Sequence, residues 1–409
     1  MAVLTLKLNV VQVLALSAFG VAAGIWIKDR APLLDRLRIP ASVVGGLVYA
    51  LLALVLRDRY LNLEMDLVLR DLLMVAFFTT IGLGASASLF RKGGVQVGLF
   101  LAITSVAAIL QNVLGIALAA LWDLPPLLGI AAGSLSLTGG PATSLAFGPM
   151  FEQLGFPTAS TVGLASAMFG IAVSGLLGGH IGNRQIQRFH LRPAEAGAPT
   201  LDQIVYAGEV PPLEATPVSP PSQTEQARLL THVVAIAVAM GVGTLISQVF
   251  ERAGLTLPAT VGAMLAGTIL RNVDDRWRLL RLSQHEIDHI GNVALALFVV
   301  MALLTLQLWQ LMSLAGPLIA ILLAQVGLVW ILCGAVFRLM GRDYDAALVS
   351  TGFCGFMLGT TANSMACMQV LAEKYGPAPR AYIVVALVGA FFLDFANALI
   401  ISTMANLVR

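Results

Sequence analysis

A single acid stands inside one of the most apolar stretches of this 409-residue chain. In "FFLDFANALI", Asp394 is the only carboxylate well inside a run long enough to cross a bilayer, and Asn397 follows about one helical turn later. Because an acid at membrane depth costs at least ~2.5 kcal/mol, such a residue normally binds a cation, carries a proton or accepts a hydrogen bond. We predict a sodium or proton site with Asp394 and Asn397 as ligands, and a purely structural hydrogen bond is the alternative.

Three neutral amides, Gln111, Asn112 and Gln325, lie at similar depths in other apolar runs. Interhelical hydrogen bonding is their expected role, and lining a cavity is the alternative. Asn112 is included as a third candidate sodium ligand.

Two stretches of small polar residues interrupt apolar sequence, "LSLTGGPATSLAFG" (135–148) and "GFCGFMLGTTANS" (352–364). Every backbone N–H and C=O needs a partner in hydrocarbon, so non-helical backbone survives there only where protein or a wet cavity covers it. Glycine supplies unusual dihedral angles and Pro141 suits the first turn of a helix, so each stretch should end one half-helix and begin another. The two new helix N-termini, each with about half a positive charge, would suit a carboxylate.

The candidate substrate-binding residues are the glycine and hydroxyl or amide positions of these two stretches. They are Ser136, Thr138, Gly139, Gly140, Thr143 and Ser144 in the first stretch, and Gly359, Thr360, Thr361, Asn363 and Ser364 in the second. The alternative is that small residues only allow helices to pack closely, but the repeat-related positions of the two stretches favour a functional role. No Lys or Arg lies deep in any apolar run, so an anionic substrate would need a co-transported cation, which favours Na⁺.

A further motif, "HEIDH" (285–289), fits the pattern of zinc proteases, with His285 and His289 one helical turn apart and Glu286 as the base. A catalytic zinc needs three protein ligands, and no third ligand motif follows. We interpret the motif as a solvated face at a helix entrance. An intramembrane zinc enzyme that uses His285 and His289 is the alternative from another functional class.

The composition explains what must position these residues. The chain is 58% apolar and 11% charged, with a mean hydropathy of +0.87, which indicates a membrane protein. About 20 apolar residues cross ~30 Å of hydrocarbon. Ten predicted spans lie at 8–27, 41–56, 72–90, 95–121, 158–182, 229–250, 259–270 with an extension, 287–307, 314–339 and 382–408.

The basic residues predict the orientation of the chain. Of its 24 Lys and Arg, 18 lie in alternate loops that would be cytoplasmic if the N-terminus is outside. We therefore predict a bacterial inner-membrane protein with several membrane passes, both termini outside and a cytoplasmic central loop. A net charge of +2 gives no indication of a nucleic-acid partner.

A proline-rich polar tract divides the chain into two similar halves. Related segments recur about 220 residues apart: "IPASVVGGLVYALL" (39–52) resembles "LPATVGAMLAGTIL" (257–270). We predict a first repeat at 1–182 with a re-entrant hairpin at about 127–149, a linker at 183–228, and a second repeat at 229–409 with a hairpin at about 346–371. Five crossings per half is an odd number, so the second half must be inverted. The expected fold is an all-α polytopic membrane protein with two inverted-topology repeats of five transmembrane helices, each with a re-entrant hairpin.

These motifs together resemble the bacterial sodium/glutamate symporter family over nearly the whole chain. The segments that carry the likeness are "RIPASVVGGL" (38–47), "RDLLMVAFFTTIGLGA" (70–85), "LQNVLGIALA" (110–119), "GSLSLTGG" (133–140), "GNVALALFVVMAL" (291–303), "GRDYDAA" (341–347), "CGFMLGTTANSMACMQ" (354–369) and "VGAFFLDFANALII" (388–401). By position, the likeness implicates Ser136, Thr138, Gly139, Gly140, Thr143, Gly355, Gly359, Thr361, Asn363, Met365, Asp394 and Asn397.

The resemblance implies Na⁺-driven uptake of L-glutamate by alternating access, in which a unit that carries the hairpins moves against a scaffold. The family's first broken stretch usually continues Gly-Gly-His-Gly-Thr, whereas Pro141 and Ala142 follow Gly140 here. A sodium- or proton-coupled carrier of another small carboxylate therefore stays open as an alternative. The expected partners are glutamate, sodium ions and the lipid bilayer, and a homodimer is one option for assembly.

Overall fold

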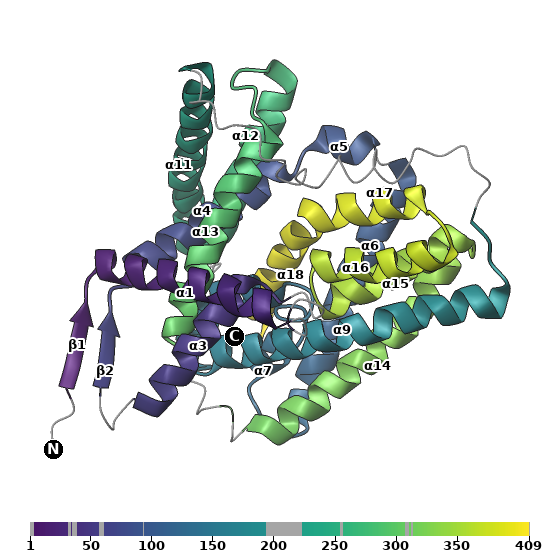
Figure 1. Cartoon of the computed structure of the whole chain (residues 1–409), viewed down its shortest axis with the longest axis horizontal. Helices are drawn as coiled ribbons and strands as arrows, with labels where there is room; N and C mark the ends of the chain where they lie inside the picture. Colours follow the sequence, from purple (N-terminus) through teal and green to yellow (C-terminus); the bar gives the residue numbers. More distant parts are fainter. Residues whose placement is uncertain are drawn as a thin grey trace.

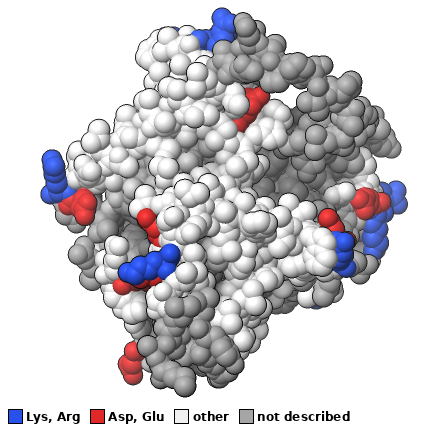
Figure 2. Space-filling view, turned by 60° about the vertical axis from the view of Figure 1, so that its left-hand side comes forward, with Lys and Arg blue, Asp and Glu red and all other residues white. Residues whose placement is uncertain are grey.

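The computed structural model describes residues 4–31, 34, 39–56, 61–92, 94–193, 223–253, 257–306, 311 and 314–408, most of which are helical (Figure 1). Six described helices are long and apolar enough to cross a membrane. They are α1 (Val10–Arg30), α6 (Gly94–Ala120), α9 (Ala159–Phe189), α11 (Gln223–Arg252), α13 (Gln284–Leu304) and α14 (Ala315–Leu339). Most of the described surface in Figure 2 is uncharged, as expected for a chain that passes through a bilayer several times.

One group of helices consists of α1, α3 (Ala41–Leu56), α4 (Val68–Gly84), α11, α12 (Ala259–Trp277) and α13. Within this group, which we call the scaffold, α1 packs against α3 and α11 packs against α12. Both pairs approach closely: a Cβ on Gly45 would lie 1.8 Å from the carbonyl oxygen of Gly20, and one on Gly262 would lie 2.2 Å from that of Gly243. The two related sequence segments thus support equivalent backbone contacts in the two halves.

The remaining long helices form a second group, which we call the hairpin unit. It contains α6, α7 (Pro126–Ala131), α8 (Gly140–Gln153), α9, α14, α15 (Tyr344–Leu358), α16 (Thr361–Tyr375), α17 (Pro379–Leu387), the π-helical segment η2 (Val388–Phe392) and α18 (Leu393–Leu407). Contacts are extensive inside each group and sparse between them, and α11 and α12 lie to one side of the hairpin unit in Figure 1. One contact between the groups is the edge-on pair of Phe78 in α4 and Phe147 in α8, with ring centroids 6.3 Å apart.

Several helix boundaries differ from the predicted spans. The helix predicted at 72–90 begins earlier, at Val68, but ends at Gly84 and is followed by the short helix α5 (Ala87–Lys92). The span predicted at 259–270 has its expected extension, which ends at Trp277, whereas α9 continues past the predicted 182 to Phe189. The part of a helix that lies outside the bilayer need not be apolar, so a transmembrane helix can continue with polar turns beyond its apolar run. Most of the predicted linker, 194–222, lies outside the described residues.

The sequence interpretation also missed a small parallel sheet, in which β1 (Leu4–Leu8) pairs with β2 (Leu61–Met65). Both strands alternate apolar and polar residues, "LTLKL" and "LNLEM". That period of two is typical of strands and could have been used to find them.

Candidate functional site

The first broken stretch lies at the junction of α7 and α8. Helix α7 ends at Ala131, residues 132–139 form turns, and α8 begins at Gly140 with φ of +71°. Pro141 stands in the first turn of α8, as predicted. The break is buried except at its tip, where Gly139 and Ala142 are partly exposed.

The second broken stretch is a tight helical hairpin. Helix α15 ends at Leu358, Gly359 and Thr360 are non-helical, and α16 begins at Thr361. The two arms pack along their length, and the Ser364 hydroxyl donates to the Gly352 carbonyl at 2.7 Å. This hydrogen bond closes the hairpin just behind its tip.

The two breaks meet. A Cβ placed on Gly140 would lie 3.1 Å from Cγ2 of Thr360, so the tip of one stretch touches the tip of the other. Behind this contact, the Thr138 hydroxyl donates to Oε1 of Gln111 at 2.7 Å. Nε2 of Gln111 in turn donates to the Met357 carbonyl at 2.7 Å, so one buried amide of α6 connects both breaks.

Helix α9 contacts both stretches, at different levels along its axis. Near its start, Gly163 lies against Leu135 and Ser144, one from each arm of the first stretch. Near its end, Gly182 lies against Thr351 and Leu371, one from each arm of the second stretch.

Between these levels, Nδ2 of Asn363 donates to the Ile171 carbonyl at 3.1 Å and to the Ser174 hydroxyl at 2.9 Å. The first stretch thus packs against the N-terminal part of α9, and the second stretch packs against its C-terminal part. The tips of both stretches lie near the middle of α9.

A buried polar cluster surrounds Ser134 next to this meeting point. The backbone N–H of Ser134 donates to Oδ1 of Asn112 at 2.9 Å, and Nδ2 of Asn397 donates to the Ser134 carbonyl at 2.9 Å. Three buried atoms here have no hydrogen-bond partner: Nδ2 of Asn112, Oγ of Ser134 and Oδ1 of Asn397. Since an unsatisfied buried polar atom costs about 1–3 kcal/mol, the cluster has hydrogen-bonding capacity for a further group.

Ser134 was not among the predicted site residues. It stands in the quoted segment "GSLSLTGG", but nothing in the sequence distinguishes it from Ser136. The structure distinguishes them, because the Ser136 hydroxyl donates to the Gly133 carbonyl while that of Ser134 is unpartnered.

Asp394 lies on α18 one turn before Asn397 and is partly buried. It makes no hydrogen bond or ion pair with any described side chain or backbone group. It stands two residues after the end of η2, a π-helical segment that was not predicted and that has no residue signature. Such segments are frequent at functional sites, and here the Thr361 hydroxyl of the second tip donates to the Gly389 carbonyl of η2 at 2.8 Å.

The hydroxyls of Ser144, Ser364 and Thr361 donate to backbone carbonyls, at 2.9 Å, 2.7 Å and 2.8 Å, and therefore hold the helices. Thr360 and Thr361 are partly exposed at the tip. Neither α8 nor α16 has a side-chain cap, and the Gly140 N–H at the start of α8 donates to the Ser136 carbonyl at 2.9 Å.

The histidine motif forms no metal site among the described residues. Nε2 of His285 and Nε2 of His289 are 3.1 Å apart on the exposed side of α13. No group of three His, Cys, Asp or Glu side chains that could hold a metal ion occurs in the part of the chain that the structure describes.

Comparison with known proteins identifies the family. The sequence model of the sodium/glutamate symporter family matches residues 6–377. The chain belongs to the sodium/glutamate symporter family. The family is one of transporters, and its curated members include a sodium/glutamate symporter of Escherichia coli (strain K12), which is 38% identical over 373 residues and covers 90% of each chain.

A sodium/glutamate symporter of Haemophilus influenzae is 33% identical over 408 residues, or 97% of each chain. Among solved structures, the sodium proton antiporter MjNhaP1 from Methanocaldococcus jannaschii aligns over 97% of each chain with a TM-score of 0.43 and 14% identity. That likeness is too remote to inform the mechanism. The family membership confirms the resemblance noted in the sequence.

Proposed function

We propose that this chain couples the inward movement of Na⁺ to the uptake of L-glutamate. The observation that carries the proposal is the contact between Gly140 and Thr360, which brings two helix breaks together inside an apolar protein. Symporters commonly hold substrate and ions where broken helices meet. Two relatives at 38% and 33% identity bear the name sodium/glutamate symporter.

The substrate carboxylates would bind at the N-termini of α8 and α16. Both helices start at the meeting point without a side-chain cap, and helix N-termini carry partial positive charge. No Lys or Arg occurs at 93–183 or 344–373, so these segments offer no fixed base. A co-transported cation would then offset the negative charge of the substrate.

The sodium ion would bind beside Ser134. Oxygen atoms suit hard cations, and the available oxygens are Oγ of Ser134, Oδ1 of Asn397 and the carboxylate of Asp394. Oδ1 of Asn112, which the sequence suggested as a ligand, already accepts the Ser134 N–H. We therefore give Asn112 the role of orienting Ser134 rather than of binding Na⁺.

The two hairpins would be re-entrant and opposed, within two inverted repeats at 1–182 and 229–409. Three observations support this arrangement: both arms of the first stretch contact the start of α9, both arms of the second contact its end, and the tips lie between. If either stretch instead crossed the whole membrane, its second arm would leave on the opposite side from its first arm. The two arms together would then contact α9 along its whole length.

Alternating access would come from movement of the hairpin unit against the scaffold. The sparse contacts between the two groups favour a sliding interface, and each group is well packed internally. With both termini outside, the first hairpin would enter from outside the bacterial inner membrane and the second from the cytoplasm. The basic residues of the alternate loops support that orientation.

The direct test is uptake of labelled L-glutamate by purified protein in proteoliposomes under an inward Na⁺ gradient. We expect accumulation that collapses when K⁺ replaces Na⁺ on both sides. Asp394→Asn should lose most of the Na⁺ dependence, because the carboxylate is removed and the amide keeps its size. Unchanged Na⁺ dependence in this variant would exclude Asp394 as a ligand.

A second candidate is a carrier of another small carboxylate. The observation that favours it is the Gly140-Pro141-Ala142 sequence at the first tip, where the family usually has histidine after the second glycine. Competition of labelled glutamate by excess aspartate, citrate or malate separates the two. Inhibition by a dicarboxylate or tricarboxylate that exceeds inhibition by unlabelled glutamate would favour the second candidate.

A further inference from the structure

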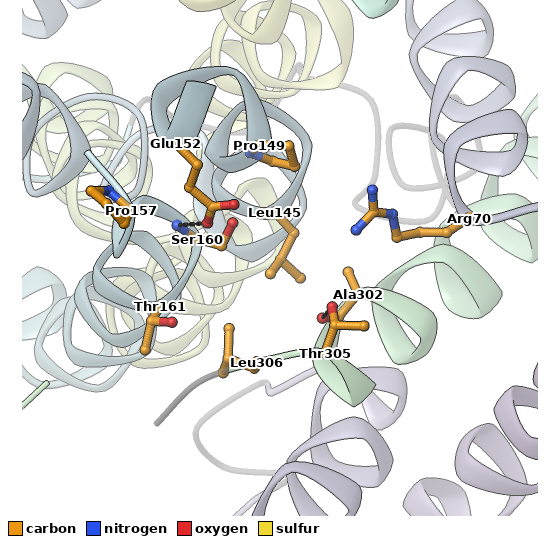
Figure 3. Close-up of a pocket in the computed structure, with 10 residues that line it drawn as sticks. All are labelled: Arg70, Leu145, Pro149, Glu152, Pro157, Ser160, Thr161, Ala302, Thr305 and Leu306. Atoms are coloured by element: carbon orange, nitrogen blue, oxygen red, sulfur yellow. Dashed lines mark hydrogen bonds between the residues drawn. The ribbon is translucent and has the colours of Figure 1, made fainter. Parts of the chain in front are cut away.

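A cavity lies between the hairpin unit and the scaffold, away from the meeting point of the tips (Figure 3). Its volume is about 80 Å³. Leu145, Pro149, Glu152, Ser160 and Thr161 line it from α8 and α9, and Arg70, Ala302, Thr305 and Leu306 line it from α4, α13 and the residues that follow α13. Its lining residues Arg70 and Ser160 stand near the starts of α4 and α9, on the predicted outer side.

The two charged residues of this cavity have opposite sign and come from different groups of helices. In Figure 3, the Arg70 side chain extends into the cavity from α4, toward the α8 residues that include Glu152. Arg70 is only 15% exposed, although it stands near the start of its helix.

Both residues have unused hydrogen-bonding capacity. Nε and Nη2 of Arg70 donate to one oxygen of the exposed Asp71, at 2.9 Å and 2.7 Å, and Nη1 has no described partner. Oε1 of Glu152 accepts the Ser160 N–H at 3.2 Å, and its Oε2 accepts from no described donor.

We propose that this cavity is a loading site for the head group of an α-amino acid, ahead of the tips. The free edge of Arg70 binds the carboxylate, because a guanidinium matches carboxylate geometry, and Oε2 of Glu152 accepts from the ammonium group. A water molecule takes about 30 Å³ in the liquid, so the cavity has room for two or three groups of that size. This is enough for the carboxylate and ammonium groups of an amino acid, whose side chain would extend out of the cavity. The choice of an amino acid rests on the proposed function.

This site differs from the tips in its need for sodium. Arg70 supplies a fixed positive charge, whereas the segments that form the tips, 93–183 and 344–373, contain no Lys or Arg. Binding in the cavity is therefore independent of Na⁺, and binding at the tips depends on it.

The experiment measures binding of L-glutamate to purified protein in Na⁺-free choline buffer, by ligand-observed NMR, with glutarate as a second probe that lacks the ammonium group. Wild type should bind glutamate weakly. Arg70→Gln should weaken both probes at least about tenfold, or ~1.4 kcal/mol. Glu152→Gln keeps the acceptor for Ser160 and should reduce glutamate binding to the level of glutarate.

Asp71→Asn is the matched control, because it removes the exposed partner of Arg70 and leaves the cavity charges in place; both probes should bind as in wild type. In uptake assays, Arg70→Gln should raise the external KM about tenfold with little change in the saturating rate.

The proposal is overturned if wild type shows no Na⁺-free binding, if Arg70→Gln binds both probes normally, or if only the saturating rate falls. Na⁺-free binding that depends on Arg70 in a protein without Na⁺-driven uptake would refute the proposed function and leave the loading site standing.

Discussion

At the scale of single residues, the structure changes which groups are expected to bind sodium. Asp394 and Asn397 were selected because polar residues are costly in hydrocarbon. Ser134 was not, since one serine among several small residues has no distinguishing cost in sequence. Its unpartnered hydroxyl, and the hydrogen bond from Nδ2 of Asn397 to its carbonyl, become evident only when α18 is packed against the first break.

Ser134→Ala should therefore weaken the apparent affinity for Na⁺ about tenfold, since one oxygen ligand is lost at a cost of ~1.4 kcal/mol. The measurement is glutamate uptake as a function of Na⁺ concentration. Ser17→Ala is the control, because Ser17 is equally buried but its hydroxyl donates to the carbonyls of Val13 and Leu14 within α1. An equal effect of both substitutions would contradict the assignment.

Asp274 provides a prediction about pH outside the membrane-spanning segments. Burial raises the pKa of this carboxyl, but hydrogen bonds from the backbone N–H groups of Leu282, Leu280 and Arg281, with the charge of Arg271, lower its pKa overall. A pKa that is lower in the folded state than in the unfolded state stabilises the fold above the ordinary value near 4, and this contribution is lost as pH falls through the folded-state pKa.

Asp274→Asn should cost about 1–3 kcal/mol at neutral pH, because backbone donors of the turn after α12 lose a charged acceptor. The difference from wild type should shrink when the pH approaches 4 and below. Thermal unfolding in detergent, followed by the fluorescence of the five tryptophans, measures both effects. Asp123→Asn, at an exposed position, should change little at any pH.

At the scale of elements, the sequence predicted most of the helices but not their internal irregularities. Apolar runs of bilayer length predicted the spans, and Gly140 and Pro141 marked the first break because their backbone requirements are specific. The π-helical segment at Val388–Phe392 has no such marker. The contact between the tips also needed the fold, since it depends on how far each hairpin extends along α9.

The first tip should be intolerant of a side chain at Gly140. Gly140→Ala puts a Cβ at φ of +71° and 3.1 Å from Thr360, with a backbone cost of about 1–2 kcal/mol. We expect at least a tenfold fall in glutamate uptake. Gly155→Ala is the matched control, since Gly155 has φ of +100° and nothing within 4 Å of an added Cβ. If both variants lose a similar amount of stability but only Gly140→Ala loses uptake, the result supports a role for the tip contact.

At the scale of the whole molecule, the division into scaffold and hairpin unit predicts which cross-links block transport. Leu145 of α8 and Ala302 of α13 line the same cavity from the two groups. In the double variant Leu145→Cys/Ala302→Cys, oxidation should abolish uptake and reduction should restore it, because a disulfide would prevent relative movement. The native Cys333, Cys354 and Cys367 are buried, so they should not interfere.

A disulfide inside the hairpin unit serves as the control for that experiment. Ser144→Cys/Gly163→Cys joins α8 to α9, where a Cβ on Gly163 would lie 3.0 Å from Cβ of Ser144. Uptake should survive oxidation here if the hairpin unit moves as one body. Loss of uptake in this pair, or its survival in the pair between groups, would contradict the proposed movement.

The polar bonds around the breaks cross from one half of the chain to the other. Asn363 of the second half is held by α9 of the first, and Asn397 of the second half holds Ser134 of the first. During synthesis, the N-terminal half is therefore inserted in the bilayer before these hydrogen bonds can form. They form only after the C-terminal half has been synthesised. Two fragments made separately in one cell should reassemble into a working carrier, whereas either fragment alone should be degraded.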